Sequence, residues 1–137
     1  MGLVYADIML KNAIDVGTAK RGYIKQKEIR QVMATAMVDT GAGTLIINEE
    51  VRQKLGLDII GLRFVTLGNN TKEKCKVTEP VQIQWNDRLC NCSALVVPGT
   101  DEVLLGAIPL EDMDLMVNPA GRNLVGVHGD DVVCMVK

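Results

Sequence analysis

The sequence is poor in aromatic residues. Of its 137 residues, one is Trp, one is Phe and two are Tyr, and together they make up 3% of the chain. Proteins that bind single-stranded nucleic acids stack bases on aromatic side chains, and nucleic-acid-binding domains carry a basic surface. Because this chain has few aromatic residues and a formal net charge of −2, we expect no nucleic-acid partner.

Long apolar segments are also missing. No apolar run approaches the roughly 20 residues that cross a bilayer, and no basic region followed by a long apolar stretch marks a signal peptide. We therefore expect a soluble, cytoplasmic protein with no membrane partner. Hydrophobic residues make up 47% and charged residues 23% of the chain, which is typical of a globular protein. The length predicts a single domain covering residues 1–137.

Residues suited to metal binding are few. The four cysteines, Cys75, Cys90, Cys92 and Cys134, lack the paired Cys-x-x-Cys spacing of a zinc site, and the chain has one histidine. We interpret the cysteines as reduced thiols, with Cys134 in the core. No metal and no cofactor are expected.

Two other arrangements of catalytic residues are unfavourable. A Ser-His-Asp triad would require the one serine, Ser93, to meet the one histidine, His128. Ser93 falls in a predicted strand without a nucleophile turn. Asp112 and Asp114 form a nearby pair of carboxylates, which we interpret as a solvated turn. Neither set is our candidate site.

Short apolar segments separated by turns fill most of the chain. Turn signals recur at intervals of about ten residues, and no βαβ rhythm is present. The pattern predicts an all-β fold, a closed barrel or sandwich, with one short helix. Strands are expected at 3–10, 32–38, 44–47, 61–77 in two stretches, 81–85, 89–97, 103–107, 115–117, 124–127 and 132–136.

The short helix is predicted over residues 49–55. Asn48 precedes it as an N-cap and Gly56 follows it as a C-terminal stop. Val51 and Leu55 share one face, which should lie on the sheet.

Three segments connect the predicted strands. Residues 11–28 contain two glycines and many charges, and they fit either a loop or a short helical excursion. Residues 68–71 read Gly-Asn-Asn-Thr, which tolerates the positive backbone dihedrals of a hairpin tip. A helical turn is expected near 109–113.

One short motif contains a residue suited to catalysis. Residues 38–42 read Val-Asp-Thr-Gly-Ala, and no second Asp-Thr-Gly or Asp-Ser-Gly occurs. Aspartic-protease chemistry needs two carboxylates close enough to share one proton, one acting as base toward a water and the other as acid toward the substrate carbonyl. A chain with one such loop has to meet a second copy of itself. Taken alone, Asp39 before Thr-Gly fits an ordinary Asx turn equally well.

The order of elements resembles that of a known family. The Asp-Thr-Gly-Ala turn is followed by a strand and short helix, a glycine-tipped hairpin, and a Leu-Leu-Gly element at 104–106. Together, across residues 32–127, they resemble the retropepsin-like aspartic proteases, above all the single-domain bacterial members. The resemblance implies a closed barrel of the acid-protease fold that supplies half of an active site per chain.

The resemblance also implies a function and a set of site residues. The protein would be a homodimeric aspartic endopeptidase that cleaves an extended peptide, with Asp39 of each copy as the catalytic carboxylate. Thr40 would join the two loops through its hydroxyl, and the hairpin would close over the substrate as a flap. The implied substrate-binding residues are Thr40, Gly41, Ala42, Gly43, Leu67, Gly68, Asn69 and Asn70.

Two positions depart from the viral pattern. Where viral members carry a second Asp after the alanine, this chain has Gly43, and the glycine of the Leu-Leu-Gly element is followed by Ala107 rather than an arginine. The interlocking salt bridges of the viral dimer are thus missing. Two alternatives to the protease stay open: a catalytically inactive dimeric peptide-binding module of the same fold, and a monomeric structural β domain.

Overall fold

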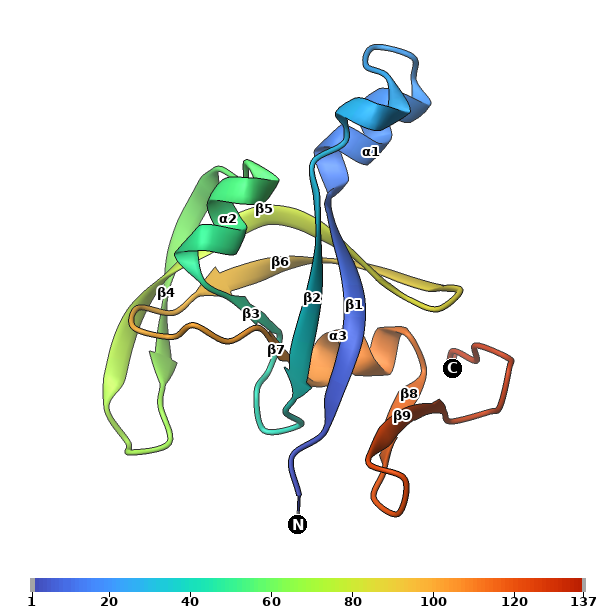
Figure 1. Ribbon diagram of the computed structural model, residues 1–137. Coiled ribbons are helices and arrows are strands. Elements are labelled where there is room, and N and C mark those ends of the chain that lie inside the picture. Colours follow the sequence, from blue (N-terminus) through green and yellow to red (C-terminus); the bar gives the residue numbers. More distant parts are fainter. Residues whose placement is uncertain (1, 137) are drawn as a thin grey trace.

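The computed structural model describes residues 2–136 (Figure 1). Strands dominate the chain. They are β1 (Tyr5–Asn12), β2 (Gln31–Val38), β3 (Leu45–Ile47), β4 (Ile59–Thr66), β5 (Lys72–Trp85), β6 (Arg88–Val96), β7 (Leu104–Leu105), β8 (Leu115–Asn118) and β9 (Asn123–Gly126). The helices are α1 (Ala13–Lys20), the 3-10 helix η1 (Gln26–Glu28), α2 (Glu49–Leu55) and α3 (Ala107–Asp112).

The main sheet closes on itself. Its strand order is β1-β2-β7-β3-β6-β5-β4, and β1 pairs in addition with β5. Six strands therefore form a ring, as the predicted barrel requires, and β4 extends from this ring as an outer strand. β7 pairs parallel to β2 and antiparallel to β3, while β3 runs parallel to β6. The β8–β9 hairpin forms a separate two-stranded sheet.

The core fills the interior of the ring. Along β1 the buried positions alternate, so that Ala6, Ile8 and Leu10 point inward while their neighbours are more exposed. The largest fully buried apolar side chains come from β1, β3, α2, β5, β7 and the connecting segments. They are Ile8, Leu10, Leu45, Ile47, Leu55, Leu57, Val81, Ile83, Leu105 and Met113.

The predicted helix over residues 49–55 is confirmed as α2. The Asn48 side chain accepts a hydrogen bond from the Val51 backbone at 2.8 Å, and Gly56 ends the helix at a φ of +63°. Val51 and Leu55 are buried against the barrel. The local signals were therefore sufficient for this element.

The prediction of one helix was wrong, because the described residues contain two further α-helices. α3 corresponds to the expected helical turn. Of the excursion over residues 11–28, residues 13–20 form α1 and 26–28 form η1, with a turn between them. Gly17 and the β-branched residues of α1 give it a weak intrinsic propensity. Its stabilisation comes from contacts with other segments. None of the helices within residues 2–136 has the length and apolar content to cross a bilayer.

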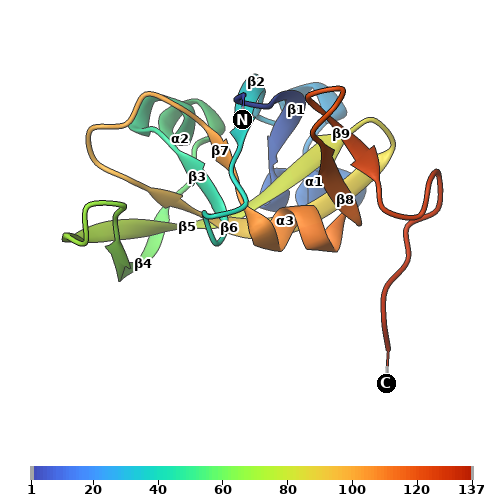
Figure 2. The same cartoon turned by 90° about the horizontal axis from the view of Figure 1, so that it is seen from below.

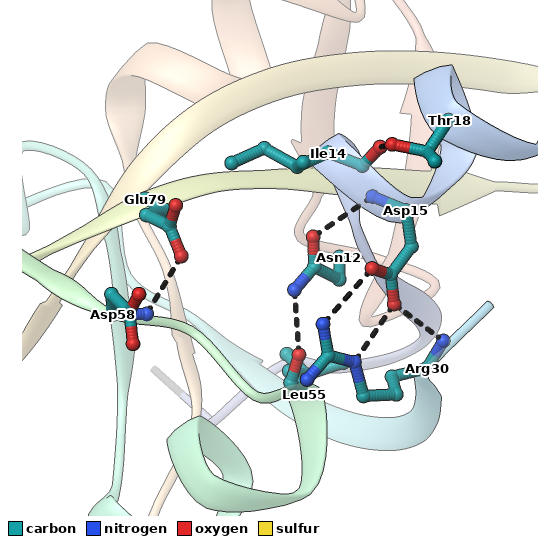
Figure 3. A network of polar contacts seen from close by, with 8 residues as sticks. All are labelled: Asn12, Ile14, Asp15, Thr18, Arg30, Leu55, Asp58 and Glu79. Atoms are coloured by element: carbon teal, nitrogen blue, oxygen red, sulfur yellow. Dashed lines mark hydrogen bonds and ion pairs between the residues drawn. The ribbon is translucent and has the colours of Figure 1, made fainter. Parts of the chain in front are cut away.

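A polar network anchors α1 to the barrel (Figure 3). The buried Asn12 side chain accepts from the Asp15 backbone at 3.1 Å and donates to the Leu55 carbonyl at 2.8 Å. The Arg30 guanidinium donates to both carboxylate oxygens of Asp15, at 2.9 Å each, and its backbone N–H adds a third bond at 3.0 Å. These bonds tie together α1, the start of β2 and the end of α2.

The segment after β9 differs from its prediction. Residues 132–136 form no strand, and their side chains are exposed because no described strand pairs with them. Cys134 is exposed as well, so its interpretation as a core cysteine was wrong. Figure 2 shows this segment leaving the barrel beyond β9.

Asp114 is also not the solvated residue that the sequence indicated. It is buried and accepts hydrogen bonds from His128 Nδ1 at 2.7 Å and from the Val133 backbone at 3.0 Å. The hydrogen bond from His128 lowers the pKa of the Asp114 carboxyl. These two hydrogen bonds thus attach the first part of the segment after β9 to the rest of the molecule.

Candidate active site

The Asp39 loop joins β2 to β3 at the end of the barrel opposite α1 (Figure 1). Asp39 follows directly on β2, and its backbone N–H donates to the Leu105 carbonyl of β7 at 3.0 Å. Its side chain is half-buried, whereas Thr40 and Gly41 are exposed. The loop therefore presents a carboxylate at the surface of the single chain.

The loop orients the Asp39 carboxylate from within. The Gly41 backbone donates to Asp39 Oδ1 at 2.9 Å, and the Ala42 backbone donates to the Asp39 carbonyl at 3.1 Å. This is the Asx turn that the sequence allowed. Oδ2 accepts no hydrogen bond within residues 2–136, so one carboxylate oxygen is fixed and the other is open to a ligand. A Cβ at Gly41 would lie 3.2 Å from Oδ1 and would crowd the carboxylate.

The Leu-Leu-Gly element and the start of α3 hold the Asp39 loop in place. The Ala107 and Ile108 backbones donate to the carbonyls of Ala42 and Gly43 at 2.8 and 3.1 Å. Gly106 lies so close that a Cβ on it would come within 2.3 Å of the Thr44 carbonyl oxygen. These ties are all formed by the backbone.

Sequence reasoning gave Gly106 no role in the site, although it noted a glycine at the end of a buried strand. The residue that follows, Ala107, stands where viral members carry an arginine. In this chain the backbone N–H of Ala107 donates to the Ala42 carbonyl, and this bond does not depend on the side chain at position 107. The signal that could have revealed Gly106 is its position directly after a buried apolar pair.

The predicted hairpin is confirmed between β4 and β5. At its tip the Leu67 backbone donates to the Thr71 carbonyl at 2.9 Å, and Asn70 adopts a φ of +64°. Gly68 and Asn69 are exposed there, and Leu67 is half-buried. The Asn69 side chain accepts from both the backbone and the hydroxyl of Thr71. The tip is thus a well-defined turn.

The hairpin tip and the Asp39 loop reach toward the same end of the molecule (Figure 1). No hydrogen bond within residues 2–136 joins them. A small apolar cluster of Cys75, Val77 and Leu95, against which Ile46 and Val65 pack, lies on the neighbouring strands β3, β4, β5 and β6. The structure therefore groups Thr40, Gly41, Ala42 and Gly43 in one loop and residues 67–70 in another.

The cysteines near the loop are free thiols, as predicted. Cys90 and Cys92 lie two residues apart on β6, where Cys90 is buried and Cys92 half-buried. The hydrogen bond with Cys92, together with burial, raises the pKa of the Cys90 thiol, which is unfavourable for a nucleophile. Within residues 2–136 no group of three or more His, Cys, Asp or Glu side chains is arranged to hold a metal ion.

Solved structures of similar fold include two informative neighbours. A retropepsin-like aspartic protease from Rickettsia conorii matches with a TM-score of 0.56 and 22% identity, over 85% of this chain and 77% of that one. The retroviral protease-like domain of Ddi1 from Leishmania major matches with a TM-score of 0.54 and 14% identity, over 91% of this chain and 88% of that one. At these identities the likeness establishes the fold.

The family assignment comes from the sequence match. Among curated proteins none matches the chain. The protein family described as "gag-polyprotein putative aspartyl protease" matches residues 14–112, which include the Asp39 loop, the hairpin and the Leu-Leu-Gly element. Because this match covers most of the chain, the protein belongs to that aspartyl protease family, and its fold is retropepsin-like.

Proposed function

We propose that this protein is an aspartic endopeptidase that acts as a homodimer. The observation that carries the proposal is the Asp39 carboxylate, held through Oδ1 by the Gly41 backbone while Oδ2 is open, in a chain with one such loop. Family membership supports the same chemistry. A second copy would supply the second carboxylate.

The proposed reaction proceeds without a covalent intermediate. The two Asp39 side chains share one proton, so that one carboxylate removes a proton from a water while the other protonates the peptide carbonyl. The water oxygen bonds to the carbonyl carbon. The tetrahedral species then collapses as the C–N bond breaks, the leaving nitrogen takes up the proton that the first carboxylate removed from the water, and a hydroxyl proton returns to the second carboxylate. Because the pair has to hold one proton, the rate should show a bell-shaped dependence on pH.

The remaining predicted residues receive roles in binding an extended peptide. The exposed Thr40 hydroxyl would bridge to the partner loop. Gly41 leaves room for the substrate backbone beside the carboxylate. The hairpin tip at residues 67–70 would close over the peptide and exclude water. Ala42 and Gly43 would line the substrate path, with their carbonyls held by α3.

The substitution Asp39→Asn tests the catalytic role. An asparagine keeps an oxygen acceptor for the Gly41 N–H but cannot share the proton, so cleavage should fall by about 10²-fold or more. The assay incubates the protein with an unstructured polypeptide from acidic to neutral pH and detects new termini by mass spectrometry. Asp7→Asn is the matched control, because Asp7 is an exposed carboxylate that contacts Thr35 on the β1–β2 pair.

The outcomes separate the proposal from its alternatives. Wild-type cleavage by Asp39→Asn would exclude the dyad. Peptide binding without cleavage in both proteins would identify a dimeric binding module. Sedimentation as a single chain at high concentration, with and without peptide, would favour a monomeric structural domain. Sedimentation should be measured over a range of protein concentrations, because a weak dimer is controlled by mass action.

A further inference from the structure

One face of the β4–β5 hairpin combines apolar and basic side chains. The two strands pair antiparallel, and residues directly opposite each other place their side chains on the same face of a sheet. Leu62 lies opposite Lys76. Phe64 lies opposite Lys74, and Lys72 shares their face because side chains alternate along a strand. These two apolar and three basic side chains form what we call the apolar-basic face.

The side chains of the apolar-basic face are exposed. Leu62 is 57% and Phe64 is 68% exposed, and the three lysines are exposed as well. The Lys74 ammonium lies 5.8 Å from the centre of the Phe64 ring, a distance at which a cation and an aromatic ring attract each other. Figure 2 shows β4 at the side of the molecule away from the β8–β9 hairpin. Apolar and cationic groups therefore meet solvent together at this side.

The net positive charge of the hairpin is confined to this face. Residues 59–76 carry two further charged side chains, Arg63 and Glu73. Both lie on the opposite face, since Arg63 is paired with the buried Cys75 and Glu73 with Val65, and their charges cancel. The three lysines thus give the apolar-basic face a charge of +3 in a chain of net charge −2. Within residues 2–136 none of these lysines joins an ion pair.

The acidic residue beside this face has a partner of its own. Glu49 of α2 lines one hollow of the surface together with Lys74 and Lys76. The Glu49 carboxylate is ion-paired with Arg52 of the same helix, which offsets its attraction for the lysines. The lysine charges are therefore available to an external anionic partner.

We infer that the apolar-basic face docks on the surface of an anionic lipid bilayer. Peripheral proteins bind such bilayers by inserting apolar side chains and by electrostatic attraction of basic ones. Leu62 and Phe64 would enter the boundary between headgroups and acyl chains, and the lysines would extend their ammonium groups to the anionic headgroups. The outer backbone edge of β4 would lie at headgroup level, where water satisfies its N–H and C=O groups.

The expectation of no membrane partner was based on the lack of a long apolar run. Such a run marks a segment that crosses the bilayer, whereas docking requires a surface. A face built from alternate residues of two strands contains no run, because every second residue points the other way. It is recognised only when the pairing register is known. Docking of this face requires no protease activity.

Two other occupants fit less well. A second copy of the chain would bring two faces of charge +3 together, and like charges repel. An acidic protein would match the charge, but protein interfaces are centred on side chains that fill pockets. The hollow beside Lys74 and Lys76 includes neither Leu62 nor Phe64. A lipid layer accepts these two side chains without a matching pocket.

Co-sedimentation of the full chain with lipid vesicles tests docking. The probes are phosphatidylcholine vesicles with and without about 30% phosphatidylserine, which supplies a negative surface potential. The protein should bind the anionic vesicles at least about tenfold more tightly, and about 0.5 M salt should abolish the difference by screening the lysines. Soluble glycerophosphoserine should not compete, because it offers no acyl layer to Leu62 and Phe64.

One set of variants tests the charge of the face. Lys72→Gln, Lys74→Gln and Lys76→Gln together should weaken binding to the anionic vesicles by about 10²-fold, since each lysine at an anionic surface contributes about fivefold. The matched control removes the same charge from the α1 side, where it should change binding by less than about twofold. It combines Lys20→Gln, Lys25→Gln and Lys27→Gln.

A second set tests the apolar contribution. Leu62→Ser and Phe64→Ser together should weaken binding by about tenfold or more, because the apolar area that enters the bilayer is lost. Both side chains are exposed, so urea unfolding should show wild-type stability within about 0.5 kcal/mol. Tyr23→Ser is the control, because Tyr23 is 80% exposed in the turn between α1 and η1 and should not contribute.

Four results would contradict docking by this face. The first is the absence of vesicle binding, or equal binding to neutral and anionic vesicles. The second is a loss of binding in the α1-side control but not in the hairpin lysine variant, which would place the basic site at α1. Binding of soluble poly-glutamate without binding of vesicles would identify an acidic polypeptide as the occupant. Wild-type affinity of the Leu62→Ser, Phe64→Ser variant would exclude apolar insertion.

Discussion

The two ends of the barrel are held together by different kinds of bond. At one end the Asp39 loop is fixed by backbone contacts from β7 and α3 and by the close approach of Gly106. At the other end α1 is fixed by side chains, through the buried Asn12 and the ion pair of Asp15 with Arg30. The first kind of attachment uses no charged group, whereas the second consists of polar and charged groups.

This difference has a chemical reason. A basic side chain beside Asp39 would bind its carboxylate and compete with a substrate or a second copy. Backbone support holds the loop and leaves one carboxylate oxygen open. At the α1 end no such constraint applies, so side chains supply the attachment. The stability of the Asp39 end should therefore respond to steric changes, and that of the α1 end to changes of polarity and pH.

The largest effect is expected from Gly106→Ala. The new Cβ would lie 2.3 Å from the Thr44 carbonyl oxygen and 2.6 Å from that of Ala42, so backbone has to move. The free energy of unfolding, measured with urea, should fall by about 3 kcal/mol. Gly43→Ala in the same loop is the control, because a Cβ there meets nothing within 4 Å. Equal stability of the two variants would contradict steric support of the loop.

A somewhat smaller effect is expected from Asn12→Ala. This buried side chain caps α1 and also bonds to the Leu55 carbonyl. Its removal should lower the free energy of unfolding by about 2 kcal/mol, because a cap is lost and a buried carbonyl is left unpaired. Asn91→Ala, at an exposed position of β6, should change stability little. A neutral result for Asn12→Ala would mean that α1 does not need this anchor.

Asp15→Asn should make the α1 end insensitive to acid. The hydrogen bond from Arg30 lowers the pKa of Asp15, so the folded state binds fewer protons than the unfolded state as pH falls. The stabilisation is present above the unfolded pKa of about 4 and is lost as pH falls through the folded pKa.

The measurement compares urea unfolding of wild type and Asp15→Asn at neutral and acidic pH. Wild type should be more stable by about 1 kcal/mol at neutral pH, since the Arg30 side chain is half exposed. The difference should shrink below about pH 4. Asp87→Asn, in the exposed β5–β6 turn, serves as the control. A difference that stays constant with pH would show that the charge of Asp15 is not what anchors α1.

The smallest effect is expected from Glu50→Gln on α2. Glu50 and Lys54 form a 2.9 Å ion pair, but both side chains are mostly exposed. The loss should be below about 0.5 kcal/mol and should disappear in molar salt. A larger loss, or one that persists in salt, would show that exposed pairs contribute as much here as the buried network around Asp15.

Elements with local signals could be predicted from the sequence. Helix α2 has its cap at Asn48 and its stop at Gly56, and the hairpin tip has residues that accept positive φ. The Asp39 turn was likewise recognisable from its Asp-Thr-Gly sequence. Each of these elements depends on residues that are close in sequence, because backbone conformational preferences and capping hydrogen bonds involve near neighbours.

Elements stabilised from a distance could not be predicted in the same way. α1 contains Gly17 and is held by Arg30, fifteen residues beyond Asp15. Asp114 is buried because the chain folds back and brings His128 and the Val133 backbone into hydrogen bonds with its carboxylate. Residues 132–136 have the composition of a strand but no described partner strand. In each case the deciding partner lies far along the chain.

The sequence by itself determined the strand-rich pattern, helix α2 and the presence of one Asp-Thr-Gly loop, because short-range backbone preferences and side-chain alternation are encoded locally. Only the tertiary structure decided how the loop is supported, why Gly106 is required there, and which edge of the sheet stays open. These features arise from contacts between strands that are distant in sequence, and the distances between such segments are set by the closed packing of the barrel.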